Sequence, residues 1–164
     1  MPSGRIHELA NTLFLVGLGS LVGAIGGDPA SPSFIAFAGG YLTGTFLITP
    51  DLDLAGKGNP RPLKRWGPLA FLWLPYGRVS AHRGLSHTWL AGPILRLVYL
   101  GVLLLPAPVL LGVELTTKGQ EALTLLGPPA FLGYLASQWG HLLLDGVPLR
   151  PVGASKRRRK RWVR

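Results

Sequence analysis

Long apolar runs alternate with short polar segments along this chain of 164 residues. The runs predict four helices, which cover residues 9–27, 34–49, 86–105 and 122–144. An α-helix rises about 1.5 Å per residue, so runs of this length approach the ~30 Å thickness of the hydrocarbon layer of a membrane. The pattern therefore predicts an all-α, polytopic membrane protein with about four transmembrane helices.

Prolines and a capping residue set the expected ends of these helices. Pro50 ends the second helix because proline cannot continue the hydrogen-bond ladder, and Pro106 ends the third in the same way. Ser86 is the expected N-cap of the third helix. Pro128 and Pro129 are expected to bend or interrupt the fourth. The first run could instead be a cleaved signal peptide, but its length exceeds the usual ~7–15 apolar residues, so we interpret it as a membrane helix.

A shorter apolar segment, residues 68–76, lies between the second and third helices. As a helix it would reach only about 13 Å, which is too short to cross a membrane. Trp66, Trp73 and Tyr76 lie in or beside it, and such aromatic residues are enriched where lipid meets water. The segment is therefore predicted to be interfacial or re-entrant, at the depth of the lipid headgroups.

Glycines four residues apart occur in both of the first two helices, as Gly19 with Gly23 and Gly40 with Gly44. This spacing allows helix backbones to approach each other closely in lipid. It predicts close helix contacts at these positions.

Composition and charge add a compartment to this picture. Of all residues 48% are hydrophobic and only 15% are charged, and cysteine is absent, which excludes disulfides and thiolate metal ligands. The net charge of +10 is concentrated in residues 57–83 and in the last nine positions. Basic clusters beside apolar segments are typical of the cytoplasmic side of a membrane. Four crossings would then place both termini in the cytoplasm.

We therefore expect two parts, a membrane helix bundle over residues 1–151 and a disordered basic cytoplasmic tail over residues 152–164. The tail is expected to attract anionic lipid headgroups, which contribute about 1 kcal/mol per basic residue. Nucleic-acid binding is the alternative interpretation of the tail. It is disfavoured because the tail has a single aromatic residue, Trp162, and no recognisable fold for reading bases.

All four histidines and three of the seven acidic residues fall at the predicted cytoplasmic ends of the helices. These residues are His7, Asp51, Asp53, His82, His87, His141 and Asp145. His141 and Asp145 are four residues apart on one helix and so share a face. His82 and His87 are five residues apart and need a turn to meet, which Gly84 could provide. The topology therefore predicts a metal site in one layer at the cytoplasmic face of the bundle.

The donor types fit a divalent metal ion. Imidazole and carboxylate groups without sulfur suit zinc, our first choice, and also manganese or iron. Asp51 and Asp53 are expected on an extended segment, where residues two apart point the same way. Alternatives without a metal role remain: His7 as an interfacial histidine, either aspartate as a turn cap, His141 with Asp145 as a hydrogen-bonded pair, and His82 with His87 in a structural role.

Several motifs in this set are shared with known families. The resemblance to bacterial membrane-bound metal-dependent hydrolases, including the LexA-regulated inner-membrane type, is carried by PDLD (50–53), HRGLSH (82–87) and GHLLLDGVPLRP (140–151). An uncharacterised bacterial family of metal-binding membrane proteins is similar in PSGRIHE at the start and in KRWGPLAFLWLPYGRVSAHRGLSH. The resemblance covers most of residues 2–151. It implies a protein of the bacterial inner membrane in which the seven residues named above form the metal site.

Two functions follow for such a site. The first is a metal-dependent hydrolase of a phosphoester near the membrane surface, with Asp53 as general base or as the group that orients a ligand. Arg83 or Arg78 would then neutralise the phosphate. The second is a non-catalytic site that ties the helices together. Arg96, in the third apolar run, is interpreted as a structural ion-pair or snorkelling residue rather than a catalytic one.

Overall fold

The protein is built from helices, as a computed structural model of residues 3–80 and 84–147 shows. The α-helices are α1 Gly4–Ala24, α2 Pro32–Phe46, α3 Arg61–Trp66, α4 Leu74–Val79, α5 Ala91–Leu104, α6 Pro106–Leu110 and α7 Thr117–Leu144. Short 3-10 helices lie between them, at η1 Pro50–Leu54, η2 Gly67–Trp73 and η3 Leu85–His87. The predicted all-α class is confirmed. The tail and the segment that contains His82 and Arg83 lie outside the described residues.

Three helical stretches are long and apolar enough to cross a membrane, by length and composition: Gly4–Ala24, Pro32–Leu54 and Ala91–Leu110. They correspond to the first three predicted helices, which supports a membrane protein. The fourth predicted crossing lies within α7. In the part of the chain that the structure describes, α7 is not among these candidates, because polar residues and glycines interrupt its apolar positions.

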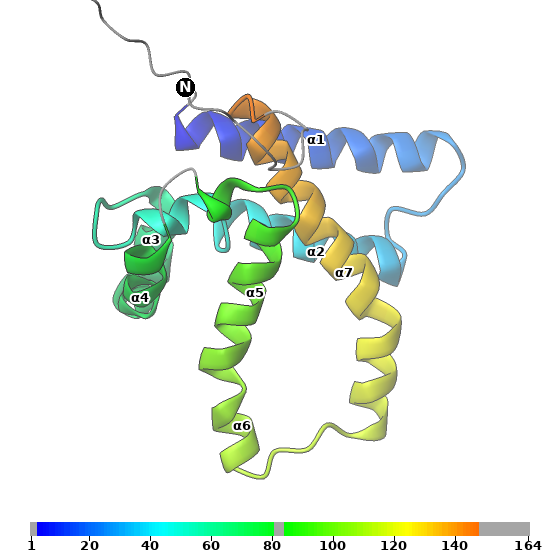
Figure 1. The fold of residues 1–164 in the computed structure, drawn as a ribbon. Coiled ribbons are helices and arrows are strands. Elements are labelled where there is room, and N and C mark those ends of the chain that lie inside the picture. The colour runs from blue at the N-terminus through cyan, green and yellow to red at the C-terminus, as the bar shows by residue number, and fades with distance from the viewer. Residues whose placement is uncertain (1–2, 81–83, 148–164) are drawn as a thin grey trace, which may run out of the picture.

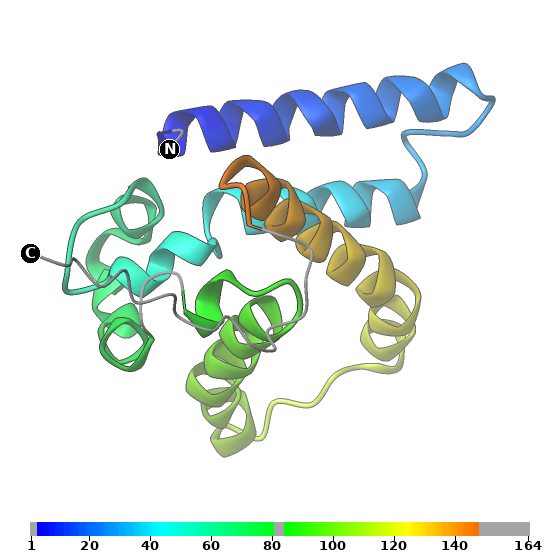
Figure 2. The same ribbon diagram turned by 45° about the horizontal axis from the view of Figure 1, so that its top comes forward.

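The helices cross one another and do not share one axis (Figures 1 and 2). α1 and α2 run in opposite directions, and α5 with α6 leads away from them toward the far end of the molecule. α7 returns from there, and its C-terminal end reaches the start of α1. The sequence predicted crossings that alternate in direction, but not that the helices lie across one another. The segments that carry the predicted site residues nevertheless meet where the helices cross.

α2 and α7 are in backbone contact at glycines. A Cβ atom added to Gly40 would lie 1.9 Å from the carbonyl oxygen of Ala130, and one added to Gly133 would lie 1.9 Å from that of Phe37. Gly44 meets α7 in the same way, since its Cβ would lie 2.0 Å from Ser137 Oγ. The predicted close contact of the second helix is confirmed. At Gly19 the nearest atom would be at an ordinary 3.5 Å, so the glycines of α1 serve no such contact.

Residues 68–76 fold back onto the protein. Trp73 and Tyr76 are buried in a hydrophobic core that also contains Leu52, Leu63 and Leu100. η2 and α4 thus turn these two aromatic side chains into the protein, whereas the depth of the segment relative to the lipid headgroups stays a prediction. The core they form supports η1, which carries two of the predicted site residues.

The predicted starts of the third and fourth helices differ from the structure. α5 begins at Ala91, and the hydroxyl of Thr88 accepts the Gly92 N–H at 2.8 Å, so Ser86 is not the cap. The predicted end of the third helix before Pro106 is confirmed, since α5 ends at Leu104, and Pro106 begins the short helix α6, where proline is well tolerated in the first turn. α7 begins earlier than predicted, at Thr117, and is bent but uninterrupted (Figure 1).

Candidate metal centre

Four separate segments carry the described candidate ligands to one place. His7 lies in the first turns of α1, Asp51 and Asp53 on η1, and His87 at the end of η3. The last turn of α7 supplies His141, and Asp145 follows at its C-cap. The three histidines are buried, with exposures of 5%, 6% and 6% for His7, His87 and His141. Six of the seven predicted ligands are thus brought together, and the seventh, His82, lies outside the described residues.

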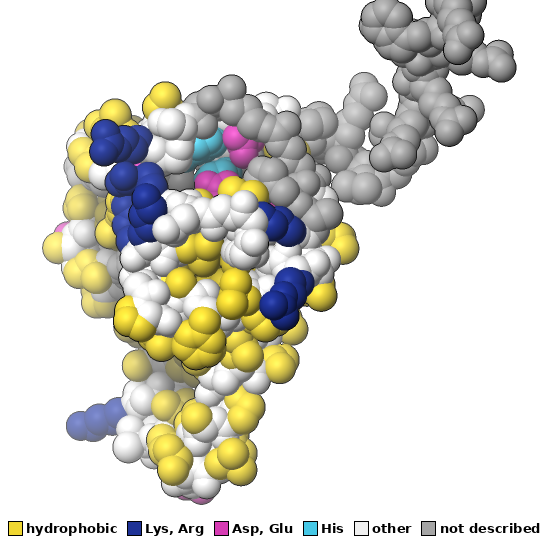
Figure 3. All heavy atoms as spheres, turned by 90° about the vertical axis from the view of Figure 1, so that its left-hand side faces the viewer, with side chains coloured by type: hydrophobic (Ala, Val, Ile, Leu, Met, Phe, Trp, Pro, Cys, Tyr) yellow, Lys and Arg dark blue, Asp and Glu magenta, His cyan; other side chains and the backbone are white. Residues whose placement is uncertain are grey.

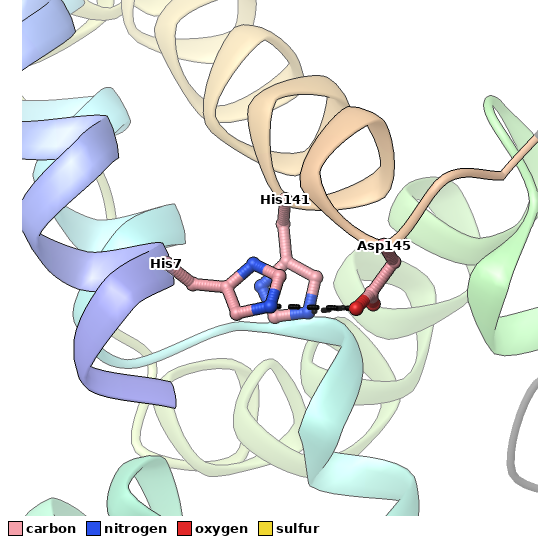
Figure 4. A group of neighbouring side chains, drawn as sticks. All are labelled: His7, His141 and Asp145. Atoms are coloured by element: carbon pink, nitrogen blue, oxygen red, sulfur yellow. Dashed lines mark ion pairs between the residues drawn. The ribbon is translucent and has the colours of Figure 1, made fainter. Parts of the chain in front are cut away.

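The carboxylate of Asp145 is the point on which the histidines converge. Its oxygens lie 3.3 Å from Nε2 of His7, 3.3 Å from Nε2 of His141 and 3.9 Å from Nε2 of His87. The rings of His7 and His141 stack with their centroids 4.1 Å apart, and both point their Nε2 atoms at Asp145 (Figure 4). His141, followed by His7 and His87, lowers the pKa of Asp145 below its ordinary value, although burial opposes this.

A second group of donors lies beside the first and shares His141 with it. Asp51, His87 and His141 each offer a ligand atom within 4.8 Å of the others, as do His7, His141 and Asp145. Asp51 Oδ1 lies 3.8 Å from Nε2 of His141. The sharing limits the number of ions, because one imidazole nitrogen has a single lone pair and can bind a single ion. Five donors, His141 among them, therefore lie around the position of the one ion that His141 would bind.

Asp53 takes a different position from Asp51. Its Oδ2 lies 3.3 Å from Nδ1 of His87, whereas Nε2 of that ring faces Asp145. Asp53 is fully buried and belongs to neither group of three donors. The expected extended segment is a 3-10 turn, so the two aspartates do not play equivalent parts. A carboxylate behind a ligating histidine commonly fixes the orientation of its ring.

The donor set fits a metal ion. Zinc binds imidazole nitrogen and carboxylate oxygen at about 2.0–2.2 Å, so tetrahedral ligand atoms lie about 3.3 Å from one another. The distances of 3.3 Å from Asp145 to His7 and His141 match that separation and exceed the usual length of a hydrogen bond. The arrangement can therefore accept an ion between the donors with little movement of the side chains.

The site opens to the surface among basic residues. Histidine and acidic side chains are visible in a hollow, with Lys and Arg side chains on both sides of it (Figure 3). Arg61 and Arg65 of α3 bind Glu8, the neighbour of His7, at 2.9 Å and 2.6 Å. Lys57 donates to the backbone carbonyl of Asp53 at 3.3 Å. Of the arginines expected to meet a phosphate, Arg78 is exposed on α4 and Arg83 lies outside the described residues.

The sequence alone did not identify two polar residues of α1 that support the site. Glu8 anchors α3 beside His7, and Asn11 donates to the Ser137 carbonyl at 3.1 Å. His7, Asn11 and Leu15 are the buried residues of α1. They are four residues apart, which is the spacing of one helix face, so the buried stripe could have been found from the sequence.

The family of the chain agrees with these donors. Residues 2–152 match the family described as uncharacterized metal-binding protein (DUF2227). The chain belongs to this family. The DUF2227 match confirms the predicted metal-binding family, whereas the relation to membrane-bound hydrolases stays a prediction.

One relative and the solved structures complete the comparison of this DUF2227 protein. An uncharacterized protein from Aquifex aeolicus (strain VF5) is 46% identical over 66 residues, which cover 40% of this chain and 45% of that protein. The match thus spans less than half of the relative. No solved structure matches the chain.

Proposed function

We propose that this protein is a metal-dependent hydrolase that acts on a phosphoester at the membrane surface. The observation that carries the proposal is the convergence of three imidazole Nε2 atoms on Asp145, at 3.3–3.9 Å, in a hollow that reaches the surface. The donors of the metal site are His7, His87, His141, Asp51 and Asp145. Zinc suits them best because they combine nitrogen and oxygen without sulfur.

The side chains at such a site would have different roles. A bound ion would lower the pKa of a water molecule and polarise a phosphoryl oxygen. Asp53 holds the ring of His87 from behind, and its complete burial favours this orienting part over that of a general base. Asp51 has the more open carboxylate, with 22% of its side chain exposed, and lies 3.8 Å from Nε2 of His141. Lys57, Arg61 and Arg65 attract an anionic substrate.

The hollow belongs, in this proposal, at the cytoplasmic face of an inner membrane. The distance of 3.3 Å between His7 and Asp145 supports a common side for the start of α1 and the end of α7. The basic residues around the hollow support the cytoplasmic side. The basic tail would then reach anionic headgroups of the same leaflet.

Metal analysis and a phosphatase assay on the same samples test the proposal. The protein, purified in detergent, should retain a divalent ion and hydrolyse p-nitrophenyl phosphate or bis-p-nitrophenyl phosphate with zinc or manganese. His141→Ala should lose both the ion and the turnover, because His141 belongs to both donor groups. Lys118→Ala, at the exposed start of α7, is the control that should keep both. Absence of turnover in the metal-loaded protein would overturn the proposal that the protein is a hydrolase.

A non-catalytic metal site is the second candidate, and the burial of the histidines favours it. His7, His87 and His141 come from three segments, and an ion between them would tie these together. Chelation should then lower the melting temperature of a protein that shows no turnover with any ester. Bound metal without turnover would therefore select this function over the first.

A further inference from the structure

Arg96 is a buried cation in the middle of a candidate membrane helix. It lies on α5 and has no exposed surface. Among the described residues, no carboxylate lies within ion-pair distance of it. Neither sequence-based interpretation of Arg96 is therefore correct, since it neither snorkels to the surface nor pairs with an acid there. A charge in such a place is costly, so its hydrogen bonds should serve a specific purpose.

The guanidinium joins two segments that carry candidate ligands. One nitrogen donates to the backbone carbonyl of Ser86 at 2.9 Å and to the Ser86 hydroxyl at 3.2 Å. The other donates to Oε1 of Gln138 at 2.7 Å. Ser86 directly precedes His87, and Gln138 lies one helical turn before His141. Arg96 thus fixes the distance between η3 and α7 next to the histidine that each contributes.

The same contacts extend to the segment that carries Asp51. The Ser86 hydroxyl donates to the carbonyl of Pro50, the neighbour of Asp51, at 3.1 Å. Gln138 Nε2 donates to the carbonyls of Gly44 and Ile48, both at 3.0 Å, where α2 ends and leads into η1. One buried network therefore fixes the positions of Asp51, His87 and His141, which form one of the two donor groups.

We propose that Arg96 is a positioning residue of the metal centre, acting through Ser86 and Gln138 on Asp51, His87 and His141. This inference rests on the metal centre of the proposed function, but it does not depend on turnover. Arginine suits the task because its planar fork reaches acceptors on two segments at once. Lysine offers a single nitrogen and cannot replace both contacts.

Metal binding by Arg96→Met, Arg96→Lys and wild type in detergent tests the proposal. Competition with a chelator should show 10- to 100-fold weaker zinc binding by Arg96→Met, the usual loss when a support of a ligand is removed. Arg96→Lys should recover only part of it. The visible spectrum of the cobalt-loaded protein should also change in Arg96→Met, because the histidines are no longer held in the same geometry. Simple destabilisation would leave that spectrum unchanged.

Tyr99→Phe is the matched control. Tyr99 lies one turn further along α5. Its hydroxyl donates to the carbonyl of Leu72, a residue well separated along the sequence from the candidate ligands. This variant should lower the melting temperature of the metal-free protein yet keep the zinc affinity and the cobalt spectrum of the wild type. If Arg96→Met does not fold, Ser86→Ala and Gln138→Met remove the partners one at a time and should weaken binding in the same direction.

The outcomes separate this inference from the proposed function. Wild-type affinity and spectrum in Arg96→Met, or in both partner variants, would overturn the role of Arg96 alone. A wild-type protein that binds no divalent ion would overturn the metal centre and with it this inference. Metal binding that depends on Arg96, in a protein without phosphatase activity, would support the inference and reject the hydrolase.

Discussion

At the scale of single residues, the two acids beside His87 do different things. Asp145 faces three imidazole rings and follows His141 by four positions, so the sequence could predict that pairing from helix geometry. Asp53 instead lies beside the Nδ1 atom of His87. Its role could not be predicted, because the sequence suggests an extended segment where the chain forms a 3-10 turn. A turn of this kind depends on the core beneath it, which no local pattern reveals.

Asp53→Asn should weaken zinc binding about 10- to 100-fold while the other donors stay in place, because an amide holds the His87 ring less firmly than a carboxylate does. Chelator competition measures the loss. Asp28→Asn is the matched control, since Asp28 lies in the turn after α1 and accepts the Ala30 N–H at 2.8 Å. Equal affinities of the two variants would contradict the orienting role of Asp53.

At the scale of helices, the apolar runs located every long helix of the described chain, because burial in lipid requires continuous apolar stretches. The sequence did not predict the short helices α3 and α4, because six residues carry too little periodicity to be recognised. The sequence predicted a close contact of α2 but not its position on α7. The Gly40–Gly44 spacing indicated a close approach, but only the structure identifies Ala130 and Ser137 as the partners of these glycines.

Gly40→Ala should destabilise the protein by about 1–3 kcal/mol, because the new methyl group would overlap the backbone of Ala130. Gly39→Ala is its neighbour and control. Nothing lies within 4 Å of a Cβ at Gly39, so alanine there should be neutral or stabilise the helix by up to about 1 kcal/mol. Thermal unfolding in detergent compares the two variants, and a Gly39→Ala protein less stable than Gly40→Ala would contradict this contact.

At the scale of the whole molecule, the gathering of distant histidines and acids was predicted from the direction of successive helices. The arrangement that produces it was not, since α1 and α2 run across α5 instead of beside it (Figure 1). Crossing angles depend on the packing of particular side chains, which hydropathy does not record. α1 shows the consequence, because only the narrow stripe of His7, Asn11 and Leu15 is buried against the other helices.

Removal of the metal should loosen α1, because His7 holds its first turns at the site. The chain has no cysteine, so a single thiol can report this motion. Leu15→Cys, at a position that is 9% exposed, should react faster with a maleimide after chelation. Leu13→Cys, at a position that is 61% exposed, should react equally with and without the ion. If Leu15→Cys reacts with the maleimide at the same rate before and after chelation, α1 is held by its other contacts alone.

The closeness of His7 to Asp145 also has a consequence for biosynthesis. A ribosome adds His7 before α7 and Asp145 after it. The nascent chain therefore cannot close the site until α7 has left the ribosome. A metal ion that needs both donors is then bound only after α7 has been made, and a chain whose translation stops before α7 lacks His141 and Asp145. Metal content would distinguish such arrested products from chains synthesised through the last helix.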